Sequence, residues 1–414
     1  MARTFEIPEY YRSPVVSTIK SARKVADQRK KDLAPTVLDL GKLKLKIARH
    51  FGFCFGVENA IEIAYRAIAE NPGKQIYLLS EMIHNPHVNN DLLARGVKFI
   101  LSTDDKELIS FDALKKDDIV IVPAFGTTLE LFSKLAARGV NPRLYDATCP
   151  FVEKVWKRAE QLGERGFTVI IHGKHTHEET RATFSHAKVN APSLVVRDMQ
   201  EARLLGEYLS KKREYTQFFT DFAGRASEGF EPEKDLVSIG VVNQTTMLAS
   251  ETYAISEFLR SVMLATYVES EIGNHFADTR DTLCYATNQN QDATQGLIES
   301  GGDLALVVGG YNSSNTSHLV ELLEQRYPTF YIKDAEEIVD AITIRHLSLA
   351  THTVQTSTGW LPRDKSTLEV LLTAGASCPD ALVDRVITKM ATLMGVEELV
   401  QSAVSETVKQ SLAM

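Results

Sequence analysis

Cysteine and tryptophan are scarce in this chain, and long apolar runs are missing. The 414 residues include four cysteines and two tryptophans. Four scattered cysteines exclude the disulfide framework of a small secreted protein and indicate a reducing compartment. No run approaches the roughly twenty apolar residues that span a bilayer. The sequence therefore predicts a soluble, cytoplasmic protein without a membrane partner.

Basic residues are also in the minority. Lysine and arginine number 46 against 54 aspartates and glutamates, which gives a net charge of -8 at pH 7. A chain with this balance has no broad attraction for nucleic acid, so we expect no nucleic-acid partner. An anionic ligand would have to be held by local groups.

The N-terminal segment is an exception to the acidic balance. Seven lysines and arginines lie between residues 12 and 31. The acids Glu6, Glu9, Asp27 and Asp32 argue against an organelle transit peptide, which is poor in acidic residues. We expect residues 1–44 to form an N-terminal extension that the cytoplasmic protein retains.

The first three cysteines are each followed by a helical pattern, an apolar strand and a polar loop, in that order. The three cysteine motifs are FGFCFGV (51–57), DATCP (146–150) and DTLCYATNQNQ (281–291). The polar loops are HNP from His84, HGKHTHEET around His177 and GGYNSSNTSH around Ser313; these residues follow their cysteines by 30, 28 and 29 positions. A recurrence this regular predicts three related units.

Each unit has a further apolar strand that ends in a small or hydroxylated loop. These strands and loops lie at 119–128, 236–246 and 368–377. Helices that alternate with short apolar strands predict an α/β fold with mainly parallel sheets, in which ligands gather beyond the carboxyl ends of the strands. We therefore expect three α/β domains around a shared centre.

We expect the following boundaries. The first domain (45–148) contains Cys54, the second (149–280) contains Cys149, the third (281–380) contains Cys284, and a C-terminal helical segment covers 381–414. The charged, phenylalanine-containing stretch 211–235 is interpreted as an excursion at the edge of the second domain.

Three cysteines beside helix starts are able to converge on a metal, because helix amides and the helix dipole favour thiolate. Three thiolates suit a [4Fe-4S] cluster with one iron left open for substrate. The alternative is that they are ordinary buried cysteines, which behave as small apolar groups. Cys378 lies outside the repeat and is interpreted as a packing residue.

The strand-end loops are rich in groups that hold phosphate or protons. HGKHTHEET has three histidines and two glutamates within nine residues, which suits proton transfer or metal binding. Hydroxyls and amides at strand ends are able to hold a diphosphate without a net basic surface. For each residue alone, a solvated loop or a turn and cap role is the alternative.

From about Leu45 to about Arg385 the chain resembles the 4-hydroxy-3-methylbut-2-enyl diphosphate reductases. The motifs GFCFGV, DATCP, HEET, NQTT, CYAT, NSSN and TAGAS occur in that family's order. The resemblance implies a trefoil of three α/β domains related by a pseudo-threefold axis, with the iron-sulfur cluster at the centre. It also implies an enzyme of the non-mevalonate isoprenoid pathway.

The resemblance assigns roles to individual residues. Cys54, Cys149 and Cys284 would bind the cluster, and Glu179 would be the catalytic proton donor. The residues that would contact the substrate's diphosphate or hydroxyl are His84, His177, Thr245, Ser313, Ser314, Asn315 and Ser377.

The implied reaction is a reductive dehydroxylation of an allylic diphosphate. The hydroxyl would bind the open iron, two electrons would pass through the cluster, and the oxygen would leave as water. Protonation at either end of the allyl system would give isopentenyl or dimethylallyl diphosphate. No GxGxxG motif follows a strand, so we expect a protein electron donor such as ferredoxin or flavodoxin.

One position departs from the family's pattern. Shorter bacterial members place a second diphosphate-binding histidine where this chain has Phe125, so that role is not transferred. Together with the N-terminal extension and the 211–235 stretch, Phe125 makes the chain resemble the longer subtype of plants and photosynthetic bacteria.

Two other functions remain as alternatives. A zinc-dependent hydrolase would use His172, His175 and His177 with a nearby carboxylate. A non-enzymatic iron-sulfur sensor would need the cluster but would not need Glu179.

Overall fold

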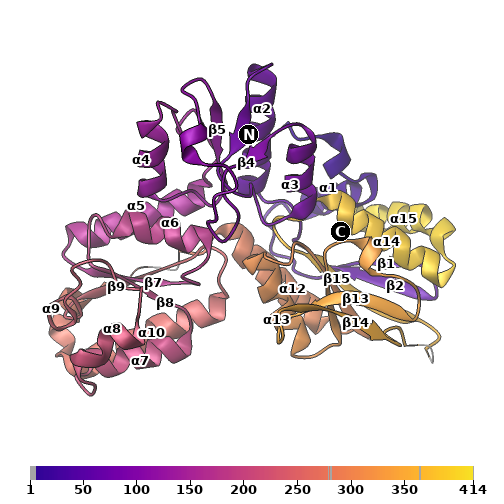
Figure 1. Ribbon diagram of the computed structural model, residues 1–414. Coiled ribbons are helices and arrows are strands. Elements are labelled where there is room, and N and C mark those ends of the chain that lie inside the picture. Colours follow the sequence, from indigo (N-terminus) through magenta and orange to yellow (C-terminus); the bar gives the residue numbers. More distant parts are fainter. Residues whose placement is uncertain (1–5, 278, 280–281, 363–364, 414) are drawn as a thin grey trace. The chain divides into compact units, whose positions relative to one another are not determined.

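The chain is described by a computed structural model that covers residues 6–277, 279, 282–362 and 365–413. It divides into two compact units (Figure 1). Unit 1 contains residues 1–58, 84–88 and 285–414, and unit 2 contains residues 59–83 and 89–284. The expected boundary at 280/281 lies outside the described residues, and the three-domain boundaries stay a prediction.

Unit 1 is built on one seven-stranded sheet of order β1-β2-β15-β11-β12-β13-β14. Neighbours from β2 to β12 are parallel, whereas β1 and the hairpin β13–β14 pair in antiparallel fashion. This hairpin was not predicted from the sequence. The strands are β1 (Thr36–Asp39), β2 (Leu43–Ile47), β11 (Leu304–Val308), β12 (Thr329–Ile332), β13 (Thr343–Ser348), β14 (Thr353–Thr358) and β15 (Leu368–Ala374).

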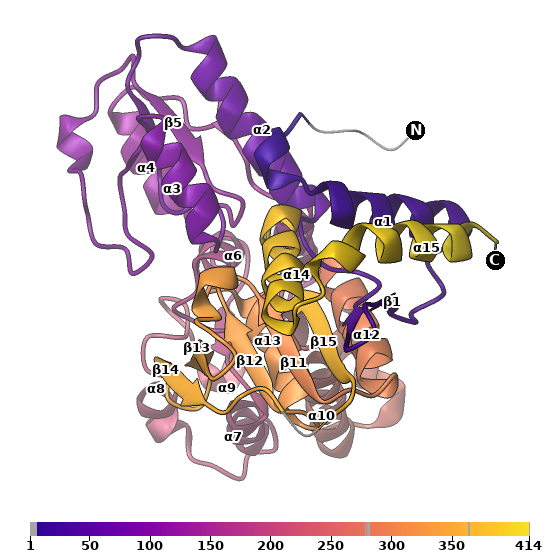
Figure 2. The ribbon, with the colours of Figure 1, turned by 90° about the vertical axis from the view of Figure 1, so that its right-hand side faces the viewer.

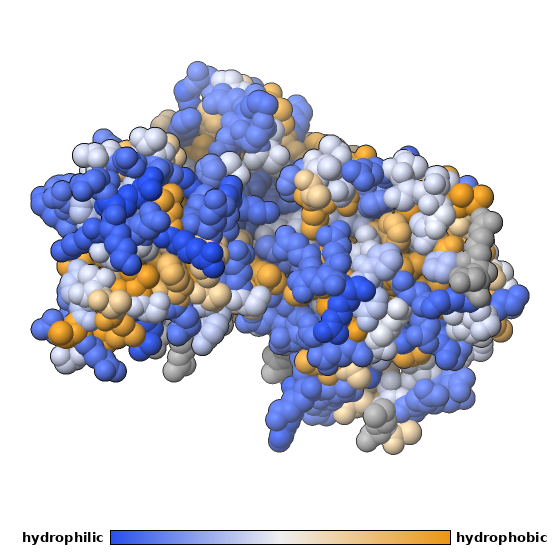
Figure 3. All heavy atoms as spheres, turned by 90° about the horizontal axis from the view of Figure 1, so that it is seen from below, coloured by the Kyte–Doolittle hydropathy of each residue, from blue (hydrophilic) through white to orange (hydrophobic). Residues whose placement is uncertain are grey.

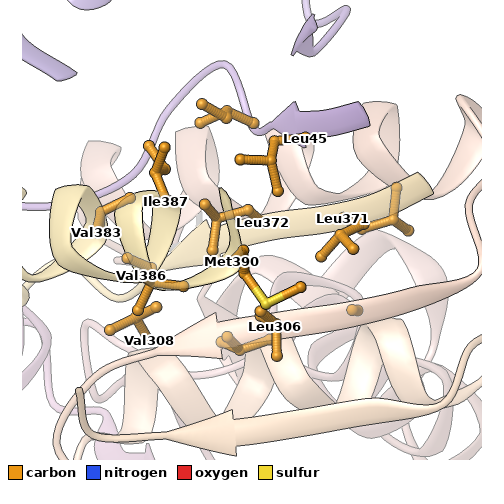
Figure 4. Close-up of a cluster of buried hydrophobic side chains, with 14 of the residues drawn as sticks. Leu45, Leu306, Val308, Leu371, Leu372, Val383, Val386, Ile387 and Met390 are labelled. Carbon is orange, nitrogen blue, oxygen red and sulfur yellow. The ribbon is translucent and has the colours of Figure 1, made fainter. Parts of the chain in front are cut away.

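Helices pack on this sheet through apolar faces. Figure 4 shows side chains of α14, including Val386 and Met390, packed against Leu306 of β11 and Leu372 of β15. The described helices of eight or more residues that lie in or begin in unit 1 are α1 (Pro14–Ala26), α2 (Phe55–Glu70), α3 (Pro86–Ala94), α12 (Tyr285–Glu299), α13 (Ser314–Glu324), α14 (Asp380–Met394) and α15 (Val400–Ala413). Helices α2 and α3 continue into unit 2.

The N-terminal extension is an integral part of unit 1. Helix α1 begins at Pro14, and Ser13 caps it by accepting a hydrogen bond from the amide of Val16. Val16 and Ile19 belong to the core cluster that includes the sheet. Figure 2 shows α1 lying along α15. Helix α1 of the extension therefore joins the core of unit 1.

Unit 2 contains two sheets of four parallel strands each. Their orders are β4-β3-β5-β6 and β10-β9-β7-β8. The strands are β3 (Ile76–Leu78), β4 (Lys98–Phe99), β5 (Ile119–Val122), β6 (Tyr145–Asp146), β7 (Thr168–His172), β8 (Ser193–Val196), β9 (Ile239–Asn243) and β10 (Phe276–Ala277). The principal helices are α4 (Leu129–Ala137), α5 (Pro150–Glu164), α6 (Glu178–Ala187), α7 (Met199–Leu209) and α10 (Ala249–Thr266), with short helices α8 (Phe218–Asp221), α9 (Pro232–Asp235) and α11 (Ile272–His275).

The stretch 211–235 contributes to the core of unit 2. Phe218 and Phe222 are fully buried, and Phe230 stacks on Phe218 with ring centroids 5.3 Å apart. All three belong to one apolar cluster with residues of β8 and α10. These three phenylalanines therefore serve packing, whereas Phe219 is exposed.

The α/β class and the mainly parallel sheets are confirmed, and so is the threefold succession of elements. Each cysteine is followed by a helix and a strand: α2 and β3 after Cys54, α5 and β7 after Cys149, and α12 and β11 after Cys284. In each sheet, the strand that follows the helix pairs in parallel with the second apolar strand of the same repeat. The pairs are β3–β5, β7–β9 and β11–β15. The loops after two neighbouring strands thus lie at one edge in every sheet.

No helix of the described residues is long and apolar enough to cross a membrane. On the face shown in Figure 3, hydrophilic residues predominate and apolar residues form small groups.

The packing of α1 makes a testable prediction about the N-terminal extension. Ile19→Ala should lower the free energy of unfolding by about 2–5 kcal/mol, because it leaves a cavity in the core. Val25, on the same helix, is 63% exposed against 3% for Ile19. Val25→Ala should stay within about 0.5 kcal/mol of the parent chain. Urea unfolding of both variants makes the comparison, and equal losses would contradict an integral α1.

Candidate active site

One hydrogen bond recurs at all three repeated cysteines. The amide of Cys54 donates to the carbonyl of Ala376 at 3.2 Å, that of Cys149 to Ala124 at 2.9 Å, and that of Cys284 to Thr245 at 3.2 Å. Each acceptor lies two residues beyond the last residue of a strand: β15, β5 and β9 respectively. Every cysteine is thereby fixed beside the strand end whose loop carries polar groups.

Each cysteine also directly precedes a helix, as the sequence predicted. Cys149 is the N-cap residue of α5, with Pro150 in the first turn, while α2 begins at Phe55 and α12 at Tyr285. The amides of Phe151 and Val152 act to lower the pKa of the Cys149 thiol. A helix start is therefore present at every cysteine.

Burial outweighs this helix effect at Cys149 in the polypeptide alone. Burial raises the pKa of the Cys149 thiol to about 11, and the nearby Cys284 and Glu179 add to the rise. Cys149, Cys284 and Glu179 are thus close enough for their charges to interact. A buried group of this composition favours a bound cation, because thiolates and a carboxylate repel one another.

Glu179 is held rigidly within unit 2. It is 2% exposed, and Oε1 accepts from the amide of Thr245 at 2.5 Å while Oε2 accepts from its hydroxyl at 2.9 Å. The carbonyl of Thr245 accepts a hydrogen bond from the amide of Cys284. Thr245 therefore connects the proposed proton donor to one of the cysteines.

His177 is the N-cap residue of α6. Its Nδ1 accepts from the amide of Glu179 at 3.1 Å. A neutral imidazole that accepts at Nδ1 carries its proton at Nε2, which is then a donor. The helix start thus fixes both the ring orientation and the tautomer. Phe125 packs against His177 edge to face, with ring centroids 5.8 Å apart. The residue that departs from the family's pattern is therefore in contact with this histidine.

In unit 1 the polar loops after β11 and β15 meet. Oδ1 of Asn315 accepts from the amide of Ala376 at 2.9 Å, and Ser313 caps α13 by accepting from the amide of Thr316. Ser314 and Asn315 are 5% and 3% exposed. Within the described part of the chain, the Ser314 hydroxyl and Asn315 Nδ2 have no hydrogen-bond partner. Buried polar atoms of this kind indicate a polar ligand.

His84 and Ser377 belong to the same part of unit 1. The hydroxyl of Ser377 donates to the carbonyl of His84 at 3.2 Å, and both residues are buried. A Cβ added to Gly310 would lie only 2.2 Å from that carbonyl. The chain carrying His84 therefore approaches the loop after β11 so closely that only glycine fits at position 310.

The predicted residues fall into two groups, one within each unit. Unit 2 gathers Cys149, Cys284, His177, Glu179 and Thr245. Unit 1 joins the His84 backbone to Ser377, and Asn315 to the loop that anchors Cys54. Cys378 is fully buried in the apolar core, which agrees with its interpretation as a packing residue.

The histidines of the zinc alternative do not converge. Nδ1 of the buried His172 lies 3.1 Å from the Thr252 hydroxyl, His175 is exposed, and His177 caps α6. Among the residues that the structure describes, these three form no metal-binding group.

One set of buried polar residues, on α12, was not predicted from the sequence. Thr287, Asn290, Gln291 and Thr294 are all less than 7% exposed, and Nδ2 of Asn290 lies 3.4 Å from Oδ1 of Asn315. The signal was present in the run NQNQDAT, whose polar residues recur at helical spacing.

Thiols, a buried carboxylate and hydroxyls at the carboxyl ends of parallel strands define an α/β protein with an enzyme-like site. The chain belongs to the LytB protein family, whose model matches residues 45–391.

Similar curated proteins include reductases of cyanobacteria, in agreement with the predicted resemblance to the longer subtype of plants and photosynthetic bacteria. A 4-hydroxy-3-methylbut-2-enyl diphosphate reductase of Gloeobacter violaceus is 39% identical over 361 residues, which cover 86% of this chain and 85% of that protein. One of Prochlorococcus marinus is 41% identical over 355 residues and covers 85% of each chain.

A solved reductase from Plasmodium falciparum, titled E-1-hydroxy-2-methyl-but-2-enyl-4-diphosphate reductase, has a TM-score of 0.60 at 19% identity. The match covers 84% of this chain and 87% of that one. This likeness supports the predicted fold.

The environment of Cys149 predicts a pH dependence of its alkylation. The thiolate is the nucleophile, so a pKa of about 11 lowers its population at every pH below that value. In the folded, iron-free chain, Cys149 should react more slowly than in the unfolded chain, and its rate should keep rising up to about pH 11. Cys284→Ala should shift the rise to lower pH. Peptide mass spectrometry measures this, and a plateau below pH 9 would contradict it.

Proposed function

We propose that this chain is a 4-hydroxy-3-methylbut-2-enyl diphosphate reductase. It removes the allylic hydroxyl of its substrate and yields isopentenyl and dimethylallyl diphosphate, the last step of the non-mevalonate pathway. The observation that carries the proposal is the buried group of unit 2 in which Thr245 bonds to both Glu179 and Cys284, with Cys149 close by. Family membership supports the same reaction.

The proposed cofactor is a [4Fe-4S] cluster bound by Cys54, Cys149 and Cys284. The donor set fits, because buried thiols beside a carboxylate need a cation to become thiolates together, and iron supplies that charge. With three protein ligands, the cluster would supply electrons and an open coordination position. The recurring amide-to-carbonyl hydrogen bond supports equivalent roles for the three cysteines.

The diphosphate is proposed to bind among the strand-end donors. Support comes from the unpartnered Ser314 hydroxyl and Asn315 Nδ2 at the start of α13, where helix amides favour anions. Ser313, Ser377 and His84 complete the unit 1 part of this set. His177 and Thr245 contribute from unit 2, with His177 Nε2 as the donor.

The proposed chemistry consumes two electrons and two protons. A C–O bond breaks, the oxygen leaves as water, and a C–H bond forms. Glu179 is proposed to deliver the proton to the departing oxygen, because it is a buried acid that Thr245 holds in a fixed position. Burial keeps bulk water from competing for that proton.

The electrons are proposed to come from a small redox protein such as ferredoxin or flavodoxin. A reducing compartment such as the cytoplasm is proposed for the protein, and its four free cysteines support this.

Metal analysis tests the proposal. Anaerobically purified protein should contain about four irons and four sulfides per chain. Ala substitutions of Cys54, Cys149 or Cys284 should lower the iron content, whereas Cys378→Ala should retain it because Cys378 lies in the core. The allylic diphosphate should oxidise a reduced dye in the presence of the parent protein. Zinc, or no metal, would overturn the cluster.

Glu179→Gln tests the proton donor. A glutamine is able to accept from the Thr245 amide and donate to its hydroxyl, so fold and iron content should persist. Turnover should fall by about 10²–10⁴-fold because the proton is lost. Glu160→Gln, an exposed position on α5, is the matched control. Parent-like turnover in Glu179→Gln would refute the assignment. In a non-enzymatic sensor, the same substitution would leave the cluster signal and the response to ligand unchanged.

A further inference from the structure

A pocket of about 200 Å³ in unit 1 lies beside Cys54 and is lined mainly by cations and rings. Its lining includes Lys20, Lys24, Lys30, Arg49, His50 and Cys54. We call it the basic pocket. Lys20, Lys24 and Lys30 precede residues 45–391, the part matched by the family model. The pocket is therefore formed in part by the N-terminal extension.

The charge around this pocket contrasts with the rest of the chain. Residues 12–31 contain seven lysines and arginines and one aspartate, whereas the whole chain has a net charge of -8. Within the described residues, Lys20, Arg23 and Arg49 have acidic partners in Asp380, Asp32 and Asp27.

Exposed cations line the pocket and neighbour its lining residues in sequence. Lys24 and Lys30 line the pocket, and Arg29 and Lys31 flank Lys30 in the chain. All four face solvent, and none of them forms an ion pair among the residues that the structure covers. Four exposed cations close together in sequence give this surface a positive potential, which attracts acidic surfaces.

His50 adds no positive charge to the pocket. Burial, followed by the charges of Arg49 and Lys30, lowers the pKa of His50 to about 4. The imidazole is therefore neutral near pH 7, and the positive charge of the lining comes from its lysines and arginine.

The walls of the pocket are fixed by the chain itself. Nζ of Lys20 donates to the carbonyl of Phe51 at 2.8 Å, and the guanidinium of Arg49 donates to the carbonyl of Arg23 at 3.2 Å. Gly52 has a φ of +75°, and a Cβ there would lie 2.5 Å from Asp380 Oδ1. The loop that leads to Cys54 is thus held in place by α1 and α14, so a partner would meet a preorganised surface.

We propose that the basic pocket and the exposed cations of residues 24–31 form the docking surface for an acidic, ferredoxin-type electron donor, which delivers electrons beside Cys54. This inference rests on the proposed function. Each donor molecule loses one electron, so two successive donors supply the two electrons of one turnover. Phe51 and Tyr285 give the pocket an apolar component, which provides close contact inside a charged rim.

A protein fits better than a small anion. The exposed cations Lys24, Arg29, Lys30 and Lys31 extend beyond the pocket, since only Lys24 and Lys30 line it. Their spread matches an extended acidic surface, and long-range attraction of this kind raises association rates.

The test compares two double variants with the same change in charge. Lys24→Glu with Lys31→Glu, called the rim variant, reverses the charge of two residues of the docking surface. Lys42→Glu with Lys212→Glu reverses two exposed lysines elsewhere. Binding of oxidised ferredoxin to the iron-loaded protein is measured by calorimetry. Turnover is then measured with reduced ferredoxin and separately with a small reduced dye.

The rim variant should bind ferredoxin at least about tenfold more weakly at low ionic strength. Its kcat/KM for ferredoxin-driven turnover should fall by the same factor as its affinity for ferredoxin, while dye-driven turnover stays at the parent level. The difference should shrink as salt approaches about 0.15 M, where screening acts over about 8 Å. The control variant should match the parent protein.

Three results would overturn the docking surface. They are unchanged ferredoxin binding in the rim variant, an equal loss in the control variant, and displacement of ferredoxin by inorganic phosphate at constant ionic strength, which would indicate a small-anion site. Absence of dye-driven turnover in the parent protein would instead refute the proposed function, and the binding comparison would still decide the docking surface.

Discussion

The hydrogen bond from each cysteine amide to the carbonyl two residues beyond a strand is the constraint on which the site depends. It occurs at Cys54, Cys149 and Cys284 with donor–acceptor distances of 2.9–3.2 Å. A backbone contact does not depend on side-chain identity, so it survives the divergence of the three repeats. It places each thiol beside a strand end while leaving the following helix free to begin. The polar loops are therefore built around the cysteines.

The same constraint explains how the chain passes from sheet to sheet. Cys54, Cys149 and Cys284 follow β2, β6 and β10, which are outer or near-outer strands of three different sheets. The helix after each cysteine leads to the first strand of the same repeat (β3, β7 or β11), which lies in another sheet. The cysteines therefore fall where the chain passes from one sheet to the next.

Sequence patterns could predict the repeat, because spacing and apolar strands are local signals. The boundaries of α5 and β11 follow directly from Pro150 and from the run LALVV. The pairing of β2 with β15 could not be predicted, since it joins segments more than 300 residues apart. Roles of the strand-end residues were accessible only through the family's motifs. The environment of Cys149 depends on burial, which spacing does not reveal.

The N-terminal helix shows why a long-range contact matters for chemistry as well as for stability. Lys20 of α1 meets Asp380 of α14 at 2.6 Å, and the pair lies against Gly52. Two residues later the chain reaches Cys54. A side chain at position 52 would collide with Asp380, and its positive φ already disfavours one. Helices α1 and α14 therefore hold the loop that leads to Cys54, although they lie more than 350 residues apart in the chain.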